Sequence, residues 1–190
     1  MNVCLYGASS NEIHPKYIAA TEALGEALAQ AGHKLVYGAG GCGLMGAAAR
    51  GMSRHGGHIT GVVPEFLNVD GILYEHCDEM IYTETMRQRK QIMEKRSDAF
   101  IVTPGGIGTY EEFFEIYTLK QLGRHQKPII LYNIDGFFDR LYDILKGLVA
   151  DGFMKDVCLS LLSFAATPQE VLAQLVADSE TVTVTDTKYV

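Results

Sequence analysis

Residues 98–117, DAFIVTPGGIGTYEEFFEIY, join a glycine-rich turn to a pair of carboxylates. Pro104 ends an apolar run, and the turn after it exposes backbone N–H groups at the start of an expected helix, at Gly105, Gly106 and Gly108. Thr109 adds a hydroxyl, so the turn is typical of a phosphate receptor. No lysine follows the glycines as in a nucleoside triphosphate loop, which favours a monophosphate.

Glu111 and Glu112 follow this turn in the first part of the expected helix. The helix dipole favours carboxylates there, so a purely structural role is the simplest interpretation. A carboxylate beside a phosphate would repel the ligand, however, unless it faces a positive charge that develops during a reaction. The oxocarbenium-like carbon C1 of a sugar carries such a charge. Successive helical residues point about 100° apart, so only one of the two glutamates can face the ligand easily.

A basic segment, TMRQRKQIMEKR at 85–96, forms the second group of candidate residues. A solvated helix face explains its five cations simply. Arg87 and Arg89, however, lie near the expected N-terminus of the helix, where a cation opposes the helix dipole. A local cost of this kind indicates a functional role.

A second glycine-rich turn, GAGGCGLMG, contains Gly41, Gly43 and Gly46 in the spacing G-x-G-x-x-G, and Glu65 ends the next expected strand. This is the pattern of a dinucleotide site. The turn follows the second expected strand, and glycines at a helix start also let the helix pack closely on a sheet. A dinucleotide site, a mononucleotide site and close packing all stay open.

Strand-like and helix-like runs alternate through the 190 residues, which we interpret as a single nucleotide-binding domain, 1–190. Strands are expected within 2–9, 33–41, 58–65, 79–84, 98–104 and 127–133, and helices at 15–32, 43–57, 85–97, 108–123, 136–152 and 167–177. The alternation predicts an α/β, Rossmann-like, doubly wound fold, with a mainly parallel sheet and helices on both faces. Its ligand should bind beyond the carboxyl ends of the strands, where the strand order reverses. Residues 66–77 look irregular, and the polar tail after about residue 179 is expected to fray.

Composition excludes several classes of protein. The formal charge is −7 and the basic residues are dispersed, which argues against a nucleic-acid partner. No apolar stretch reaches the length of a membrane span, so no membrane partner is expected. The first residues lack the features of a signal peptide, and the four cysteines lie far apart. A cytoplasmic location is therefore expected.

Three segments together carry a family resemblance: PGGIGTYEE, GGCGLMG and MRQRK. Over about residues 1–175 the chain resembles the LOG family of cytokinin riboside monophosphate phosphoribohydrolases, which are often mislabelled as lysine decarboxylases. The resemblance implies a Rossmann-like fold and hydrolysis of the N-glycosidic bond of AMP or an N6-substituted AMP, which yields the free base and ribose 5-phosphate. It also implies that no metal or redox cofactor is used, and that the protein is a homodimer with sites near the subunit interface.

The resemblance assigns roles residue by residue. Arg89 and Glu112 match the catalytic arginine and glutamate of the family. The phosphate-binding turn falls on Gly105, Gly106, Gly108 and Thr109, and the further substrate-binding positions are Met86, Lys90 and Gly41. Arg87 departs from the pattern because many members have histidine there, which leaves the preferred base open.

Three other interpretations remain. A lysine decarboxylase would hold pyridoxal phosphate on a desolvated lysine, but the lysines here lie in polar segments. A metal hydrolase could use His55 and His58, or the HCDE segment at 76–79, although no set of residues has ligand spacing. A non-catalytic nucleotide-binding or sensor protein would use both glycine turns, yet binding alone does not need the Arg89 and Glu112 pair.

Overall fold

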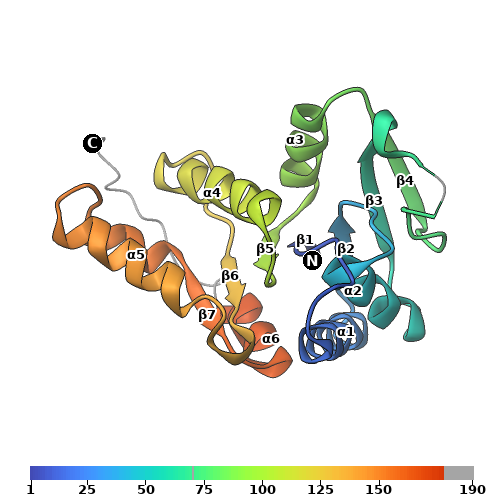
Figure 1. Ribbon diagram of the computed structural model, residues 1–190, viewed down its shortest axis with the longest axis horizontal. Coiled ribbons are helices and arrows are strands. Elements are labelled where there is room, and N and C mark those ends of the chain that lie inside the picture. Colours follow the sequence, from blue (N-terminus) through green and yellow to red (C-terminus); the bar gives the residue numbers. More distant parts are fainter. Residues whose placement is uncertain (70, 178–190) are drawn as a thin grey trace.

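Seven strands build one sheet in the computed structural model, which describes residues 1–69 and 71–177. Every pair of neighbouring strands is parallel, and the order is β4-β3-β2-β1-β5-β6-β7 (Figure 1). The strands are β1 (Asn2–Tyr6), β2 (Lys34–Tyr37), β3 (Ile59–Pro64), β4 (Glu79–Thr83), β5 (Ala99–Val102), β6 (Ile129–Tyr132) and β7 (Ser163–Ala165). The sheet confirms the predicted doubly wound α/β fold.

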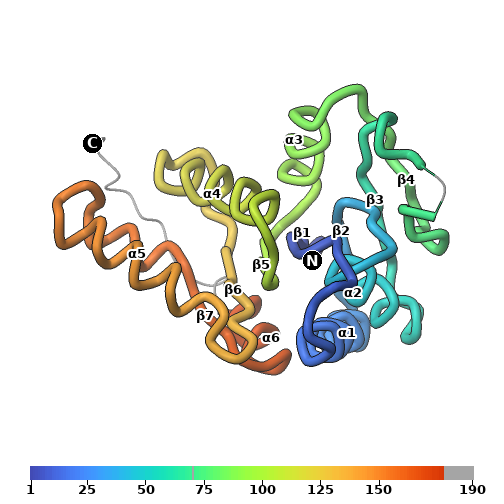
Figure 2. The backbone as a smooth tube through the Cα atoms, in the orientation of Figure 1, coloured from blue at the N-terminus to red at the C-terminus, as the bar shows by residue number. Residues whose placement is uncertain are grey.

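Within the described residues, six α-helices cover the two faces of this sheet (Figures 1 and 2). They are α1 (Pro15–Gln30), α2 (Gly43–Arg54), α3 (Met86–Arg96), α4 (Ile107–Gln121), α5 (Asp139–Ala150) and α6 (Pro168–Ala177). Helices α1, α2 and α6 pack with the sheet in one apolar core, and α3, α4 and α5 pack in the other. The strands read as continuous apolar runs because both of their faces are buried.

The main differences between the expected and observed elements concern β7 and the start of α5. Strand β7 was not predicted, because three residues are too few to show a strand pattern. The helix expected from Gly136 begins instead at Asp139, because Asp135 adopts a left-handed conformation (φ 53°) inside the short 3-10 turn Ile134–Gly136. The tail expected to fray lies outside the described residues.

The strand order reverses between β1 and β5, which lie side by side. Their carboxyl ends are tied together, since the Thr103 hydroxyl donates to the Tyr6 carbonyl at 3.0 Å and the Ala8 N–H donates to the Pro104 carbonyl at 3.1 Å. A β-carbon at Gly7 would lie 2.1 Å from Oγ1 of Thr103, so the two loops can approach only with glycine there. The loops after β1 and β5 therefore meet where a doubly wound fold binds its ligand.

The described helices were also compared with the requirements of a membrane-spanning helix. None of them, over residues 1–69 and 71–177, combines the length and apolar character that a membrane-spanning helix requires.

Candidate functional site

The N-terminus of α4 is uncapped and faces open space. Gly106 is the N-cap residue and supplies no side chain, and within the described part of the chain the N–H groups of Ile107 and Gly108 donate to no protein acceptor. A β-carbon at Gly106 or Gly108 would meet no atom within 4 Å, and neither residue has the positive φ that would demand glycine. Neither packing nor backbone geometry explains these glycines, whereas close approach of an anion to the helix end does.

Replacement of Gly108 by alanine separates binding from stability. The added methyl meets no protein atom and alanine favours the helix, so the free energy of unfolding should rise by roughly 0.5 kcal/mol. The same methyl would occupy the approach to the helix end and raise the KM for a nucleoside monophosphate by about tenfold, which corresponds to about 1.4 kcal/mol. Thermal unfolding and steady-state kinetics check both effects. A more stable protein with an unchanged KM would contradict the assignment of the phosphate site to this turn.

Arg89 and Glu112 meet beside the uncapped helix end. Nη2 of Arg89 lies 3.6 Å from Oε1 of Glu112, and their side chains are only 9% and 12% exposed. Burial raises the pKa of the Glu112 carboxyl to about 7, and the Arg89 guanidinium opposes that rise. Nε of Arg89 is buried and has no hydrogen-bond partner among the described residues. A carboxyl with a pKa near neutrality can both hold and release a proton in the physiological range.

The position of Arg89 depends on α3 and on the end of β2. Helix α3 begins at a capping box in which the Thr85 side chain accepts from the Gln88 N–H and the Gln88 side chain accepts from the Thr85 N–H. The guanidinium then passes over Gly38, where a β-carbon would lie 1.8 Å from Nη2 of Arg89. Gly38 thus leaves the space that Arg89 occupies. Gly38 is not among the predicted site residues, because its only signal in the sequence is a glycine directly after an expected strand.

A cavity of about 360 Å³ brings together six of the predicted site residues. They are Met86, Arg89, Gly106, Gly108, Thr109 and Glu112. The loop after β1, Met45 of α2 and Met86 of α3 also line this cavity. The arrangement offers helix N–H groups for an anion, a buried carboxyl, a guanidinium with an unpartnered donor, and an apolar methionine wall.

Lys90 and Glu111 lie outside this arrangement or at its rim. Lys90 forms ion pairs with Glu111 and, at 2.6 Å, with Glu115, and it lines the groove between α3 and α4 instead of the cavity. The Glu111 side chain is 54% exposed, whereas that of Glu112 is buried. Both glutamates line the cavity, but the turn of the helix directs Glu112 into it and leaves Glu111 at its rim, largely in solvent. Gly105 faces a neighbouring cavity.

The first glycine turn has its helix N–H groups already occupied. Gly43 donates to Oδ1 of Asn11 at 2.8 Å, and Leu44 donates to the Ala8 carbonyl at 2.8 Å. A β-carbon at Gly46 would lie 2.0 Å from the carbonyl oxygen of Gly41, whose own N–H donates to Ile72. These contacts favour the packing interpretation of G-x-G-x-x-G over a dinucleotide site, and Gly41 lies away from the cavity.

The residues considered for metal binding or for a Schiff base lie outside the cavity of Arg89 and Glu112. The structure shows no group of three or more His, Cys, Asp or Glu side chains able to hold a metal ion, within residues 1–69 and 71–177. Nδ1 of His58 lies 3.7 Å from Asp78 at the surface, and His55 lies 3.9 Å from Glu26. No described lysine lines the cavity of Arg89 and Glu112 or the cavity beside Gly105, which is where a Schiff-base lysine would have to act.

Comparisons with known proteins identify the family of this chain. A family model described as "Possible lysine decarboxylase" matches residues 45–175. The rice protein "Probable cytokinin riboside 5'-monophosphate phosphoribohydrolase LOGL5" is 38% identical over 173 residues, which cover 91% of this chain and 70% of the rice chain. "Cytokinin riboside 5'-monophosphate phosphoribohydrolase LOG7" of Arabidopsis thaliana is 36% identical over 173 residues, 91% of this chain and 80% of its own.

Solved structures share the fold at lower identity. The Moco carrier protein from Chlamydomonas reinhardtii is 22% identical with a TM-score of 0.73, covering 95% of this chain and 98% of its own. The molybdenum cofactor binding protein from Rippkaea orientalis is also 22% identical, with a TM-score of 0.67, 95% of this chain and 96% of its own. Such likeness shows the fold alone. The family model and the plant relatives show more: this chain belongs to the LOG family of cytokinin riboside 5'-monophosphate phosphoribohydrolases.

Proposed function

We propose that the protein hydrolyses the N-glycosidic bond of AMP or an N6-substituted AMP and releases the free base and ribose 5-phosphate. One observation carries this proposal: the buried Arg89 and Glu112 pair shares a cavity with the uncapped N-terminus of α4. The plant relatives, whose names specify phosphoribohydrolase activity, support it.

Helix α4 keeps the phosphate site at its N-terminus apart from the carboxylate of Glu112. Gly108 and Glu112 are four residues apart in α4, which corresponds to about 6 Å along the helix axis. A phosphate at the helix end therefore lies about one turn from the carboxylate, and the ribose between them brings C1 towards Glu112. The carboxylate then faces the sugar and is kept away from the phosphate that would repel it.

The reaction follows from this placement. The bond between C1 and the base nitrogen breaks, the bonding electrons leave with the base, and positive charge develops on the sugar. Ionised Glu112 stabilises that charge, orients a water molecule and accepts its proton as the water oxygen bonds to C1. Arg89 favours the ionised form of Glu112, and its unpartnered Nε can donate to the departing base or to the substrate. The proton that Glu112 takes from the water is passed to the base, directly or through solvent, so the base leaves neutral and the carboxylate is regenerated.

The rate should depend on pH through Glu112. Because burial raises the pKa of its carboxyl to about 7, the ionised form is scarce at pH 5 and predominant at pH 8. We expect kcat/KM for AMP to rise with pH through an apparent pKa near 7. The substrate phosphate titrates near pH 6, so the pH dependence of ribose 5-phosphate binding is the control. The pH dependence of kcat/KM is divided by that of ribose 5-phosphate binding. If the resulting value falls from pH 6 to pH 8, Glu112 acts as a proton donor instead.

Incubation with AMP, without added metal, tests the function itself. Chromatography should show adenine and ribose 5-phosphate in equal amounts. Adenosine and inorganic phosphate as products would identify a phosphatase instead. Intact AMP that nevertheless binds would support the alternative function, a non-catalytic nucleotide-binding or sensor protein.

The base preference also belongs to this proposal. Met45 and Met86 line the catalytic cavity, and flexible methionine side chains adapt to apolar groups of different shape. This wall supports acceptance of an apolar N6 substituent as well as adenine. The ratio of kcat/KM for isopentenyladenosine monophosphate and AMP measures the preference.

We further propose a cytoplasmic homodimer, as the family membership implies. The four cysteines are free, which suits a reducing compartment. Exposed apolar side chains along α5 and directly after it would suit a subunit contact: Ile144, Leu148 and Phe153. Sedimentation equilibrium should give twice the chain mass of 20.9 kDa, whereas a single-chain mass would contradict the dimer.

A further inference from the structure

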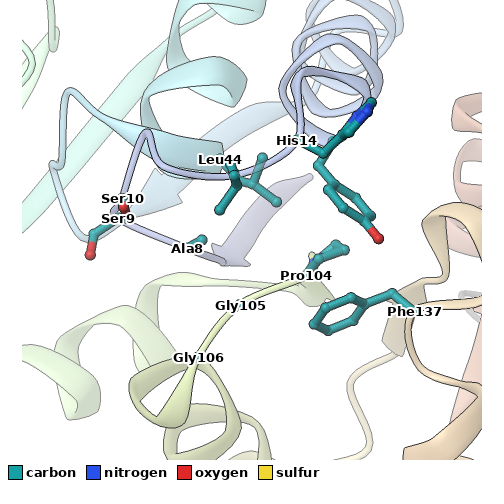
Figure 3. A pocket seen from close by; sticks show the side chains of 11 residues that line it. Ala8, Ser9, Ser10, His14, Leu44, Pro104, Gly105, Gly106 and Phe137 are labelled. Atoms are coloured by element: carbon teal, nitrogen blue, oxygen red, sulfur yellow. The ribbon is translucent and has the colours of Figure 1, made fainter.

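A second cavity of about 410 Å³ adjoins the catalytic one. The two cavities share a wall formed by Ala8, Ser9 and Gly106, so they meet at the helix end that we assign to the phosphate. Figure 3 shows Leu44, Pro104 and Phe137 around this second space, with Gly105 and Gly106 along one side. Its volume lies within the range of small-molecule sites, roughly 300–1,000 Å³.

The walls of the second cavity are mainly apolar and aromatic. The Tyr17 and Phe137 rings meet edge to face, with centroids 5.9 Å apart and an interplanar angle of 78°. Lys16 at the start of α1 forms an ion pair with Asp135 in the loop after β6, which ties together the segments that carry these rings. The aromatic part of the wall is therefore formed by contacts of the protein itself.

Few polar groups face this space. Nδ1 of His14 accepts from the Lys16 N–H at 3.2 Å, so in the neutral ring Nε2 carries the proton and is a donor. The Ser10 hydroxyl accepts from the Glu12 N–H at 3.0 Å. The chemistry of the cavity suits an aromatic or other apolar group with a polar edge, and it differs from the charged surroundings of Arg89 and Glu112.

The two cavities meet at the phosphate turn and are otherwise lined by different segments. The catalytic cavity is lined mainly by α3 and α4, whereas the second is lined by the loop after β1, by Tyr17 of α1, by Leu44 of α2 and by Phe137 after β6. A phosphate at the helix end can therefore carry one ester oxygen towards Glu112 and another towards Phe137. Gly106, with open space where a side chain would be, obstructs neither direction.

We propose that the second cavity binds an aromatic or apolar group esterified to the 5'-phosphate, so that the site accepts 5'-phosphodiesters of adenine nucleosides as well as the monophosphate. The proposal rests on the placement of the phosphate in the proposed function. In such a complex the ligand would occupy both sides of the crevice between β1 and β5, as dinucleotides do in other doubly wound folds.

Equilibrium binding tests the proposal independently of turnover. Carbocyclic AMP lacks the ring oxygen that stabilises an oxocarbenium ion, so it can be titrated without cleavage. Calorimetry would compare its 5'-phenyl ester with its 5'-methyl ester, which has the same charge. We expect the phenyl ester to bind about tenfold more tightly, the equivalent of about 1.4 kcal/mol. Phe137→Ala should abolish this preference and leave the affinity for carbocyclic AMP within about twofold of wild type.

Two further variants make the result decisive. Phe137→Leu keeps an apolar side chain and should retain part of the preference. Phe66→Ala removes an exposed aromatic ring that lines neither cavity and should change nothing. Equal affinities for the phenyl and methyl esters, or a preference that survives Phe137→Ala, would overturn the proposal. Failure of carbocyclic AMP itself to bind would instead contradict the phosphate placement in the proposed function.

Discussion

Glu112→Gln should lower kcat for AMP hydrolysis by about 10²-fold or more, because glutamine cannot carry the charge that stabilises the developing oxocarbenium ion. It keeps the size of the side chain, which is buried within 3.6 Å of Arg89, so the fold should survive. The KM should change little, since the phosphate binds about one helical turn away. Steady-state measurement of base release gives kcat and KM, and circular dichroism checks the fold.

The neighbouring residue provides the matched control for this variant. Glu111→Gln makes the same chemical change on a side chain that is 54% exposed and paired with Lys90. Its kcat should stay within about threefold of wild type, because exposed ion pairs contribute little. A folded Glu112→Gln protein with normal turnover would refute the catalytic assignment, and so would an Glu111→Gln variant that is the more impaired of the two.

Gly38→Ala should lower kcat/KM by about 10²-fold, because misplacement of a catalytic group by about 1 Å has effects of that size. The added β-carbon would lie 1.8 Å from Nη2 and 2.9 Å from Cζ of Arg89, so the guanidinium must move away from Glu112. The variant should still fold, since the arginine side chain is flexible. Kinetics and a structure of the variant would measure the loss and the displacement.

Gly147→Ala is the control for a glycine that has no such neighbour. It lies in α5, where a β-carbon would meet no atom within 4 Å, and alanine there should leave turnover unchanged. A Gly38→Ala enzyme with full activity would show that the observed position of Arg89 is not required. Partial recovery of activity in Gly38→Ala when Arg89 is shortened to lysine would support the steric explanation.

Local sequence patterns predicted most of the fold because each element carries its own signal. Buried strands read as short apolar runs, and Gly32 marks the end of α1 with a left-handed conformation (φ 75°). Thr167 and Glu170 mark the start of α6, where the Thr167 hydroxyl accepts from the Glu170 N–H. Strand β7 could not be predicted in this way because its three residues take their strand conformation from pairing with β6.

The candidate site was predictable where its geometry is local to one helix. The phosphate turn and Glu112 belong to one continuous segment, and the helical period separates Glu112 from Glu111. The contact of Gly38 with Arg89 joins residues 51 positions apart, so it depends on the packing of α3 over the end of β2. The capping of α2 by the loop after β1 is likewise tertiary, and it is why the spacing of Gly41, Gly43 and Gly46 did not reveal the use of that turn.

The most direct test of the account compares base release from AMP and isopentenyladenosine monophosphate with release from the two unphosphorylated nucleosides. If the uncapped helix end of α4 places C1 beside Glu112, free base should form from the monophosphates alone, without added metal. Base released equally from the nucleosides would contradict the phosphate site. Release from none of the four compounds would contradict the hydrolase and leave a nucleotide-binding protein.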